Sequence, residues 1–506
     1  MRIRFLIPVA ATLACAAPQP TTSAARVDPA APAVRFLLVN DVYVLDTMSD
    51  GTGGLARIAW LRDSLARDGR VIFVLAGDVL SPSLLSKWFS GRQMVEGFNA
   101  ARLDYATFGN HEFEIPRDTL IARIAASRFR WLSANCTLSD SASTPFPGVA
   151  PWDTVTVNGV RVGIFGTTLT GSYARYVRCS DPDSAATRAI DELRAAGAEL
   201  VVALTHQTVE ADSALLAREP DLDIVLGGHE HDAHWVDVAG RRVLKADANS
   251  RSAQVAALHP GSGLRWITRD TLVRAGPGMP FDAATLAVAV AWRDTLQRRL
   301  GAERIVGTLA EPLDARDGPL RRQEMPVGNL VADAMRGGTG ADVALINSGA
   351  MRLDDVIAAG PVGNFQLESM FLFADETRVV TFPLTGARLR VVLEHSVASA
   401  GRGGFLQISG VQLTYDPSRP EGSRIVGELR RADGRGIRAE DMLAVAMVAY
   451  PACEGGDGYE ISEAQEGDAC RRRTESPRTV DLLVRHLAGF PGGRIEQPPV
   501  ERVNRL

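Results

Sequence analysis

The sequence is poor in lysine and has no surplus of positive charge. Only Lys87 and Lys245 are lysines among 55 basic residues, and the net charge over 506 residues is −5. Binding to a nucleic-acid polymer needs many basic contacts to phosphate, so the composition argues against such a partner. Hydrophobic residues make up 46% and charged residues 23%, as in globular proteins rather than disordered ones. The length predicts two or three domains.

Long apolar runs are also missing. No segment beyond residue 15 approaches 18 uninterrupted apolar residues, so we expect no membrane span in the mature chain. Residues 1–15 combine a charged start, a short apolar stretch and Cys15, which is the pattern of a signal peptide. Ala11-Thr12-Leu13-Ala14-Cys15 resembles a bacterial lipobox, in which Cys15 is lipidated; the alternative is ordinary secretion that removes Cys15. Residues 16–33 are rich in Ala, Pro, Thr and Ser and predict a flexible tether.

Cysteine is scarce, and its spacing excludes one kind of site. With Cys15 assigned to the leader, four cysteines remain, which form two plausible local pairs, Cys136 with Cys179 and Cys453 with Cys470. An even number fits an oxidising compartment; the alternative is four buried free thiols. None has Cys-x-x-Cys spacing, so we expect no thiolate zinc site.

Short apolar runs alternate with helical patterns from residue 34 onward, which predicts an α/β domain over 34–275. Helical spacing of apolar residues follows the first run, over 55–65, and the second run, over 84–98. Residues 276–305 predict a linker with an inter-domain helix, and residues 306–495 a second domain. The expected strands are 34–39, 71–76, 105–108, 162–165, 200–204 and 224–226.

Polar residues follow most of these strands at their carboxyl ends, which is where open α/β sheets bind ligands. Any one aspartate or histidine alone would be read as a turn or core residue, but four of the eight histidines fall in these motifs. Together the side chains make a mixed nitrogen and oxygen set suited to a pair of divalent metals. The motifs are Asn40-Asp41-Val42-Tyr43, Gly77-Asp78, Gly109-Asn110-His111-Glu112, Thr205-His206 and Gly227-Gly228-His229-Glu230-His231.

These motifs resemble those of the calcineurin-like metallophosphoesterases, and specifically the secreted 5′-nucleotidase and UDP-sugar hydrolase family. The resemblance covers nearly the whole mature chain. It implies an N-terminal four-layer α/β/β/α metallophosphoesterase domain and a C-terminal α/β substrate-binding domain. It also implies a catalytic histidine, His111, oriented by Glu114, and two divalent ions from among Zn, Mn, Co and Mg. Carried over from the family, one metal is held by Asp41, Asp78 and His231, and the other by Asp78, Asn110, His206 and His229.

Two residues depart from the family pattern. Tyr43 stands where the family has a histidine ligand. Either its phenol coordinates, which would favour iron, or the first metal is bound loosely and water fills the gap; we favour the second reading. Glu114 stands where the family has an aspartate, and we expect the longer side chain to orient His111 as well.

The C-terminal half resembles the family's substrate-binding domain. Arg321 and Arg352 match phosphate-contacting arginines, and Asn347 begins the loop that leads to Arg352. Phe373 matches the first of two aromatic residues that hold the nucleotide base, and Asp457, in Gly455-Gly456-Asp457-Gly458-Tyr459, matches a residue that binds ribose. The second aromatic position aligns with Pro451, so either Tyr450 takes its place or the base is stacked on one side only.

The resemblance therefore predicts a metal-dependent 5′-nucleotidase that acts on a small nucleotide outside the cytoplasm. We expect a periplasmic or cell-surface protein, held to the membrane only through a lipid on Cys15. The alternatives are hydrolysis of a UDP-sugar or a 2′,3′-cyclic nucleotide by the same chemistry, or a non-catalytic nucleotide-binding lipoprotein.

Overall fold

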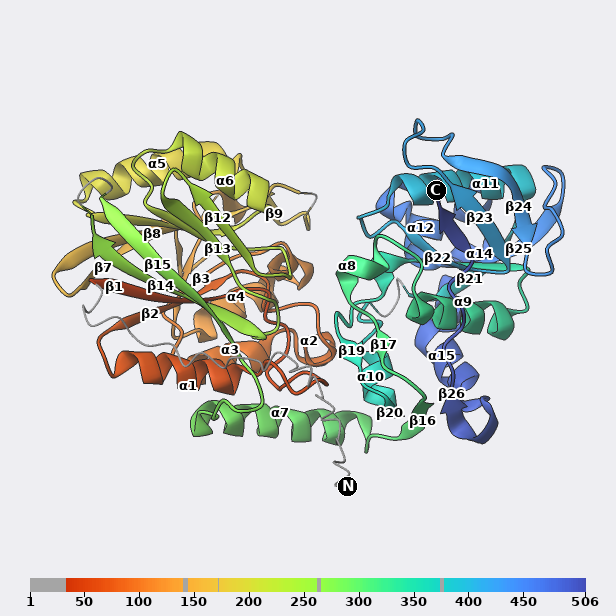
Figure 1. The fold of residues 1–506 in the computed structure, drawn as a ribbon, viewed down its shortest axis with the longest axis horizontal. Coiled ribbons are helices and arrows are strands. Elements are labelled where there is room, and N and C mark those ends of the chain that lie inside the picture. Colours follow the sequence, from red (N-terminus) through yellow and green to blue (C-terminus); the bar gives the residue numbers. More distant parts are fainter. Residues whose placement is uncertain (1–32, 140–143, 172, 262–264, 374–376) are drawn as a thin grey trace, which may run out of the picture.

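The computed structural model describes residues 33–139, 144–171, 173–261, 265–373 and 377–506. The expected leader, Cys15 and all but the last residue of the expected tether lie outside this range. The described chain forms two α/β halves, which lie side by side in Figure 1. None of the described helices is long and apolar enough to cross a membrane.

Two mixed sheets form the centre of the N-terminal half. The seven-stranded sheet has the order β15 (Trp266–Arg274), β14 (Ser252–Pro260), β1 (Val34–Val39), β2 (Val71–Ala76), β3 (Tyr105–Thr107), β4 (Arg130–Leu132) and β6 (Val149–Ala150). The six-stranded sheet has the order β12 (His234–Val238), β13 (Arg241–Lys245), β11 (Ile224–Gly228), β10 (Leu200–His206), β8 (Val160–Thr168) and β7 (Trp152–Val157). Within each sheet the central strands are parallel, so their carboxyl ends share one edge.

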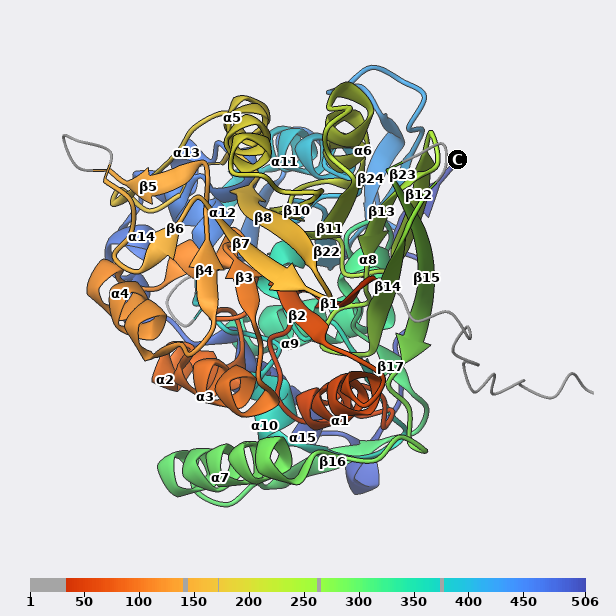
Figure 2. The same cartoon turned by 90° about the vertical axis from the view of Figure 1, so that its left-hand side faces the viewer.

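Successive side chains along each strand point to opposite faces of the sheet, which explains why the two sheets stack. In β1, Phe36 and Leu38 pack against the six-stranded sheet, whereas Leu37 and Val39 face helices α1 (Leu55–Ala66) and α3 (Arg92–Ala101). Helices α5 (Pro182–Ala195) and α6 (Val209–Arg218) cover the outer face of the other sheet. Figures 1 and 2 show the resulting order of layers. The expected α/β/β/α architecture is confirmed.

The expected strands all form, and β1 and β2 have the expected bounds. The helix expected over 84–98 is instead two helices, α2 (Leu84–Phe89) and α3. Ser90 and Gly91 between them adopt left-handed backbone conformations, with φ of 48° and 76°, which end the first helix. A Cβ at Gly91 would also lie 2.7 Å from Leu80.

A long helix, α7 (Ala283–Leu300), connects the halves, as expected. Asp282 caps it by accepting a hydrogen bond from the Thr285 amide at 2.9 Å, and the helix ends at Gly301, whose φ is 84°. It packs on α1 and α3 along the lower side of the N-terminal half in Figure 1. Leu296 of α7 joins Leu84 and Leu372 in a small apolar cluster between the halves.

A four-stranded sheet organises the C-terminal half, with the order β21 (Val379–Thr385), β25 (Met442–Val448), β18 (Val343–Asn347) and β22 (Leu406–Ser409). Alternate residues of β18 belong to two cores, one with α9 (Pro326–Thr339) and α15 (Thr479–Ala488) and the other with α11 (Gly386–Ala398).

The other strands are β5 (Cys136–Leu138), β9 (Val177–Cys179), β16 (Ile305–Leu309), β17 (Leu313–Asp314), β19 (Val356–Ile357), β20 (Gly360–Gly363), β23 (Val411–Tyr415), β24 (Ile425–Arg431), β26 (Arg494–Ile495) and β27 (Val503–Arg505). The other α-helices are α4 (Arg117–Ala126), α8 (Asp317–Leu320), α10 (Asn364–Glu368), α12 (Ala449–Glu454), α13 (Ser462–Gln465) and α14 (Asp468–Arg471).

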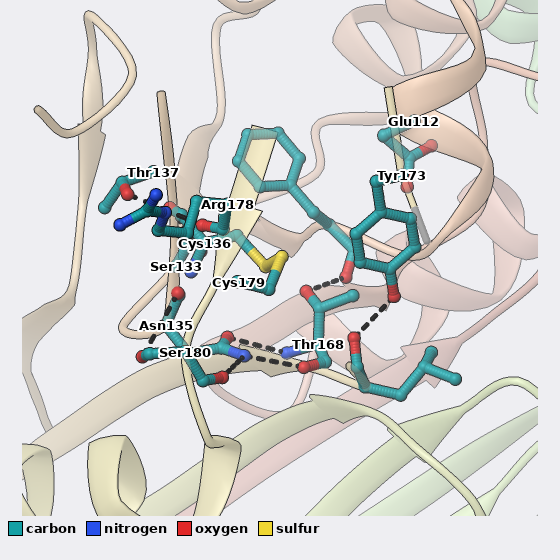
Figure 3. The surroundings of a disulfide bond; sticks show 12 residues. Glu112, Ser133, Asn135, Cys136, Thr137, Thr168, Tyr173, Arg178, Cys179 and Ser180 are labelled. Carbon is teal, nitrogen blue, oxygen red and sulfur yellow. Dashed lines mark hydrogen bonds between the residues drawn. A yellow bond between two sulfur atoms is a disulfide. The ribbon is translucent and has the colours of Figure 1, made fainter. Parts of the chain in front are cut away.

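Both expected disulfides are confirmed, so the reading of four free thiols is wrong. Cys136–Cys179 joins β5 to β9, and Cys453–Cys470 joins α12 to α14. Figure 3 shows the first one beside Asn135, whose side chain bonds both the amide and the carbonyl of Thr168. Thr168 in turn donates to the carbonyl of Phe108, two residues before Asn110. This disulfide therefore lies behind the Gly109-Asn110-His111-Glu112 loop.

Candidate metal centre and substrate cavity

The expected ligands converge at the shared edge of the two sheets. Asp41 and Asp78 come two residues after β1 and β2, His206 ends β10, and His229 follows β11. Asp41, Asp78 and His206 are fully or almost fully buried, and one ligand atom from each lies within 4.8 Å of the others. Two carboxylates and an imidazole, drawn from loops far apart in the sequence, therefore meet at one point.

The backbone at this point adopts rare conformations. Asp41, Asp78 and His229 have φ of 53°, 58° and 87°, a region that residues other than glycine seldom visit. Such conformations cluster at functional sites because the surrounding fold must hold them. Close packing also explains Gly109, where a Cβ would lie 2.0 Å from the Asp78 carboxylate.

The remaining expected ligands lie around the same cluster. The Nε2 atom of His231 is 3.7 Å from Asp41 Oδ1, and Asn110 Oδ1 is 3.2 Å from His206 Nε2. The rings of His206 and His229 are 5.2 Å apart. The structure thus brings together every residue that the family resemblance assigns to the two metals.

Tyr43 points into this cluster. Its phenol oxygen lies 3.3 Å from Asp41 Oδ1, 3.2 Å from Asp78 Oδ2 and 3.3 Å from His231 Nε2. Burial and the two carboxylates raise the pKa of the Tyr43 phenol well above its ordinary value. The phenol oxygen therefore lies within 3.3 Å of an atom of each of the three expected ligands of the first metal.

The charged groups of the cluster shift one another's pKa values. Burial raises the pKa of Asp41, whereas the effect of burial at Asp78 is overcome by His206 and His111, which hold its pKa well below the usual range. Burial would lower the pKa of His206, but Asp78 and Asp41 raise it to about 10. Burial and the neighbouring His206 lower the pKa of His229 to about 4. The two carboxylates thus favour the charged form of His206.

This donor set fits a divalent metal. Buried carboxylate charge needs a cation or another charged partner, and no lysine or arginine of the described chain forms an ion pair with Asp41 or Asp78. Carboxylate, amide and imidazole groups are the ligands that such ions prefer.

Two buried groups that sequence reasoning gave no role support the loops. Glu112 accepts hydrogen bonds from the amides of Asp78, Val79, Leu80 and Gly109, at 2.6 to 3.0 Å, and so ties two ligand loops together. Lys245, fully buried, donates to the carbonyls of Gln207 and Gly228, next to two candidate ligand histidines.

The charge of Lys245 is compensated by Asp212, at 2.9 Å, and Glu230, at 2.5 Å. Glu230 stands inside a recognised motif, and Lys245 is one of two lysines in the chain, but neither fact predicts their contact.

His111 lies beside the cluster with both ring nitrogens engaged. Its Nδ1 is 2.5 Å from Glu114 Oε1, and Ser81 holds the other oxygen of Glu114 at 2.7 Å. Its Nε2 accepts from Arg352 Nη2 at 2.8 Å. Glu114 thus reaches His111, as expected, and an arginine of the C-terminal half meets the same ring.

A cavity of about 850 Å³ opens next to His111 and is lined by both halves. The N-terminal half contributes Asn110, His111 and Glu114. The C-terminal half contributes the expected substrate-binding residues Arg321, Asn347, Arg352, Phe373, Tyr450 and Asp457. Ser81, Lys87 and Tyr173 also line the cavity, although no sequence motif pointed to them.

Tyr450, not Pro451, faces this cavity. Tyr450 is the second residue of α12 and lines the cavity, whereas Pro451, the third, is buried. A Cβ at Gly456 would lie 2.4 Å from the Tyr450 ring, so the glycine loop packs directly on it. In the same loop, Asp457 accepts from Asn347 Nδ2 at 2.7 Å.

Comparison with known proteins matches both halves. Residues 34–233 match the calcineurin-like phosphoesterase family, and residues 305–464 match the 5′-nucleotidase C-terminal domain. A 5′-nucleotidase of Diplobatis ommata is 24% identical over 491 residues, which cover 84% of this chain and 82% of that protein.

Solved structures share the fold. A 5′-nucleotidase precursor from Thermus thermophilus superposes with a TM-score of 0.78 at 24% identity, covering 94% of this chain and 99% of that chain. The sulfate thiohydrolase SoxB of the same organism superposes with a TM-score of 0.76 at 18% identity, covering 95% and 98%. With both domain models matched in sequence order, the chain belongs to the 5′-nucleotidase family of calcineurin-like metallophosphoesterases.

Proposed function

We propose that this protein releases phosphate from nucleoside 5′-monophosphates in a metal-dependent reaction. The observation that carries the proposal is one cavity that is lined both by Asn110 and His111, beside the metal cluster, and by Phe373 and Tyr450. A phosphate group at one end of this cavity and a flat base at the other would use both sets of residues.

The metal centre would hold two divalent ions. Asp41, Asp78 and His231 would bind one, with Tyr43 beside it, and the second would be bound by Asp78, Asn110, His206 and His229. Such a pair supplies an activated water and stabilises the oxygens of an in-line displacement. Zinc, manganese, cobalt and magnesium suit these ligands, and iron does if the Tyr43 phenol coordinates.

His111 would hold a proton at the leaving oxygen of the ester. Glu114 bonds Nδ1, so Nε2 faces the cavity, where proton transfer to a substrate oxygen is feasible. Arg352 now donates to the same Nε2 atom. An incoming phosphate would accept from Arg352 instead and free His111 for this role.

The C-terminal residues would set specificity. Arg321 and Arg352 carry planar guanidinium groups that suit phosphate oxygens. The Asn347 and Asp457 pair would bind the ribose hydroxyls, and Phe373 with Tyr450 would stack on the two faces of the base. This arrangement supports a two-sided base clamp in which Tyr450 replaces the aromatic residue that Pro451 displaces.

Export of the protein is part of the proposal. Two disulfides suit an oxidising compartment, and one related structure is of a precursor. We infer that residues 1–15 direct secretion, that Cys15 carries a lipid, and that residues 16–33 tether the globular part. The proposed functional domains are 34–275 and 306–495, joined through 276–305.

Phosphate release by the metal-free chain, resupplied with single metals, tests the function. AMP should be hydrolysed well above p-nitrophenyl phosphate, because only AMP carries a base. Preference for UDP-glucose or 2′,3′-cyclic AMP would keep the chemistry and change the substrate. Activity only on a sulfur ester would move the chain toward the SoxB-like chemistry that the same fold supports. AMP binding without turnover would identify a non-catalytic binding protein.

A further inference from the structure

One loop of the C-terminal half reaches into the metal centre of the N-terminal half. The loop lies between Ala350 and β19, and three of its side chains cross between the halves. Arg352 meets His111, Asp354 meets His231, and Asp355 bonds Ser49 and Arg251. Asp354 is the only one of the three that touches an expected metal ligand.

The contact between Asp354 and His231 is short and directional. Asp354 Oδ2 lies 2.7 Å from the Nδ1 atom of His231, while Nε2 of the same ring faces Tyr43 and Asp41. The carboxylate therefore takes the proton-bearing outer nitrogen and leaves the inner nitrogen directed at the proposed metal. Carboxylates that hold ligand histidines in this way orient the ring and raise its basicity.

His206, a candidate ligand of the other metal, is held differently. His206 Nδ1 bonds the carbonyl of Ala76, in its own half, at 2.8 Å. Among the described residues, Asp354 is the hydrogen-bond partner of His231 Nδ1, and no residue of the N-terminal half takes that role. One of the two proposed metals would thus depend on the C-terminal half, and the other would not.

The Asp354 carboxylate is itself anchored. Its Oδ1 accepts from the Asp317 amide at 2.9 Å, and its backbone φ of 47° lies in the left-handed region, which aspartate and asparagine tolerate best. Asparagine at this position therefore keeps the backbone but offers only one oxygen for two donors. Either the Asp317 amide or the His231 ring loses its acceptor.

We propose that Asp354 is a positioning residue for His231, so that the C-terminal half completes the first metal site from across the inter-domain boundary. This inference rests on the proposed metal-dependent function. By thermodynamic reciprocity, metal at that site stabilises the juxtaposition of the two halves by the same factor as the halves stabilise the metal.

The test is a competition titration of the full-length, metal-free chain with Zn²⁺ against a chromophoric chelator. His231→Ala identifies which of two binding events belongs to the first site. Asp354→Asn should weaken that event about 10- to 100-fold and leave the other within about twofold. The matched control is Asp355→Asn, on the same loop and also at the inter-domain boundary, which should leave both events within about threefold.

Thermal melting of the metal-free variants distinguishes a loss of folding stability from a loss of His231 positioning. Asp354→Asn and Asp355→Asn should melt within a few degrees of the wild type without metal, and differ in how far Zn²⁺ raises the melting temperature. Wild-type zinc affinity in Asp354→Asn, with two ions bound, would overturn this inference alone. Equal losses in both variants would also overturn it, by assigning the effect to the loop as a whole. Failure of the wild type to bind zinc would overturn the proposed function and this inference together.

Discussion

The two halves of the molecule build their parts of the site in different ways. In the N-terminal half, each candidate ligand follows or ends a buried parallel strand, so the sheet edge places it. In the C-terminal half, the residues that line the cavity come from the end of one strand, from helix ends and from loops, which no single sheet edge aligns. The first arrangement suits chemistry that needs fixed geometry, and the second suits recognition that varies among relatives with the same fold.

The largest effect should come from the centre of the N-terminal arrangement. Asp78→Asn removes the carboxylate that faces both proposed metals, so metal content and AMP hydrolysis should fall further than in the other variants below. Loss of a partner that merely orients a ligand already costs about 10- to 100-fold in metal affinity. The control is Asp104→Asn, a carboxylate that caps the Phe73 amide at the opposite end of the sheet. Equal metal content in Asp78→Asn and wild type would refute the ligand assignment.

His111→Ala should separate catalysis from metal binding within the same half. Turnover should fall by about 10²- to 10⁴-fold, the usual contribution of a positioned acid or base, while metal content stays at the wild-type value. Inductively coupled plasma analysis and steady-state kinetics measure the two quantities. His234→Ala, just outside the last motif, serves as the control. Loss of metal in His111→Ala would show that the histidine is a ligand instead.

The two cavity-lining aromatic residues of the C-terminal half should affect substrate choice and not metal binding. Phe373→Ala and Tyr450→Ala should each weaken AMP binding, through KM, by the equivalent of about 1–3 kcal/mol, the usual contribution of stacking on a base. Hydrolysis of p-nitrophenyl phosphate, which has no base, should change little. If Tyr450→Ala left the AMP to p-nitrophenyl phosphate ratio unchanged, stacking would be one-sided.

Each half also has one disulfide, which allows a direct comparison of stability. The separations are 43 residues for Cys136–Cys179 and 17 for Cys453–Cys470. The chain-entropy model gives losses in unfolding free energy of about 4 and about 3 kcal/mol when each pair is replaced by serine. Chemical denaturation measures both. A larger loss for the shorter loop would show that packing, rather than loop closure, dominates.

Tyr43→His should have the smallest effect, and it tests the one departure from the family within the N-terminal cluster. Imidazole is a better ligand than a neutral phenol for zinc and manganese. We therefore expect tighter binding of the first metal and unchanged binding of the second in a chelator competition. Weaker binding in Tyr43→His, together with a visible absorption band for the iron-loaded wild type, would identify Tyr43 as a coordinating phenolate.

Sequence patterns predicted the N-terminal half well, because buried strands there end abruptly in polar residues. Asp41, Asp78 and His206 could be grouped from position alone, since parallel strands share their carboxyl edge. The break at Ser90 and Gly91 was missed because hydrophobic spacing continues across it. The position of Tyr450 could not be decided, because a one-residue offset in a loop has no periodic signal.

The chemistry at the strand ends follows from the order of residues alone, since the hydrophobic runs set where each strand stops and which side chain comes next. The contacts of Arg352 with His111 and of Asp354 with His231 arise instead from the folded arrangement of the two halves. Those contacts depend on how the two halves pack across α7 and α2, where a few apolar residues set the approach. Contacts between the two halves have no periodicity along the chain, so they appear only when the halves are in place.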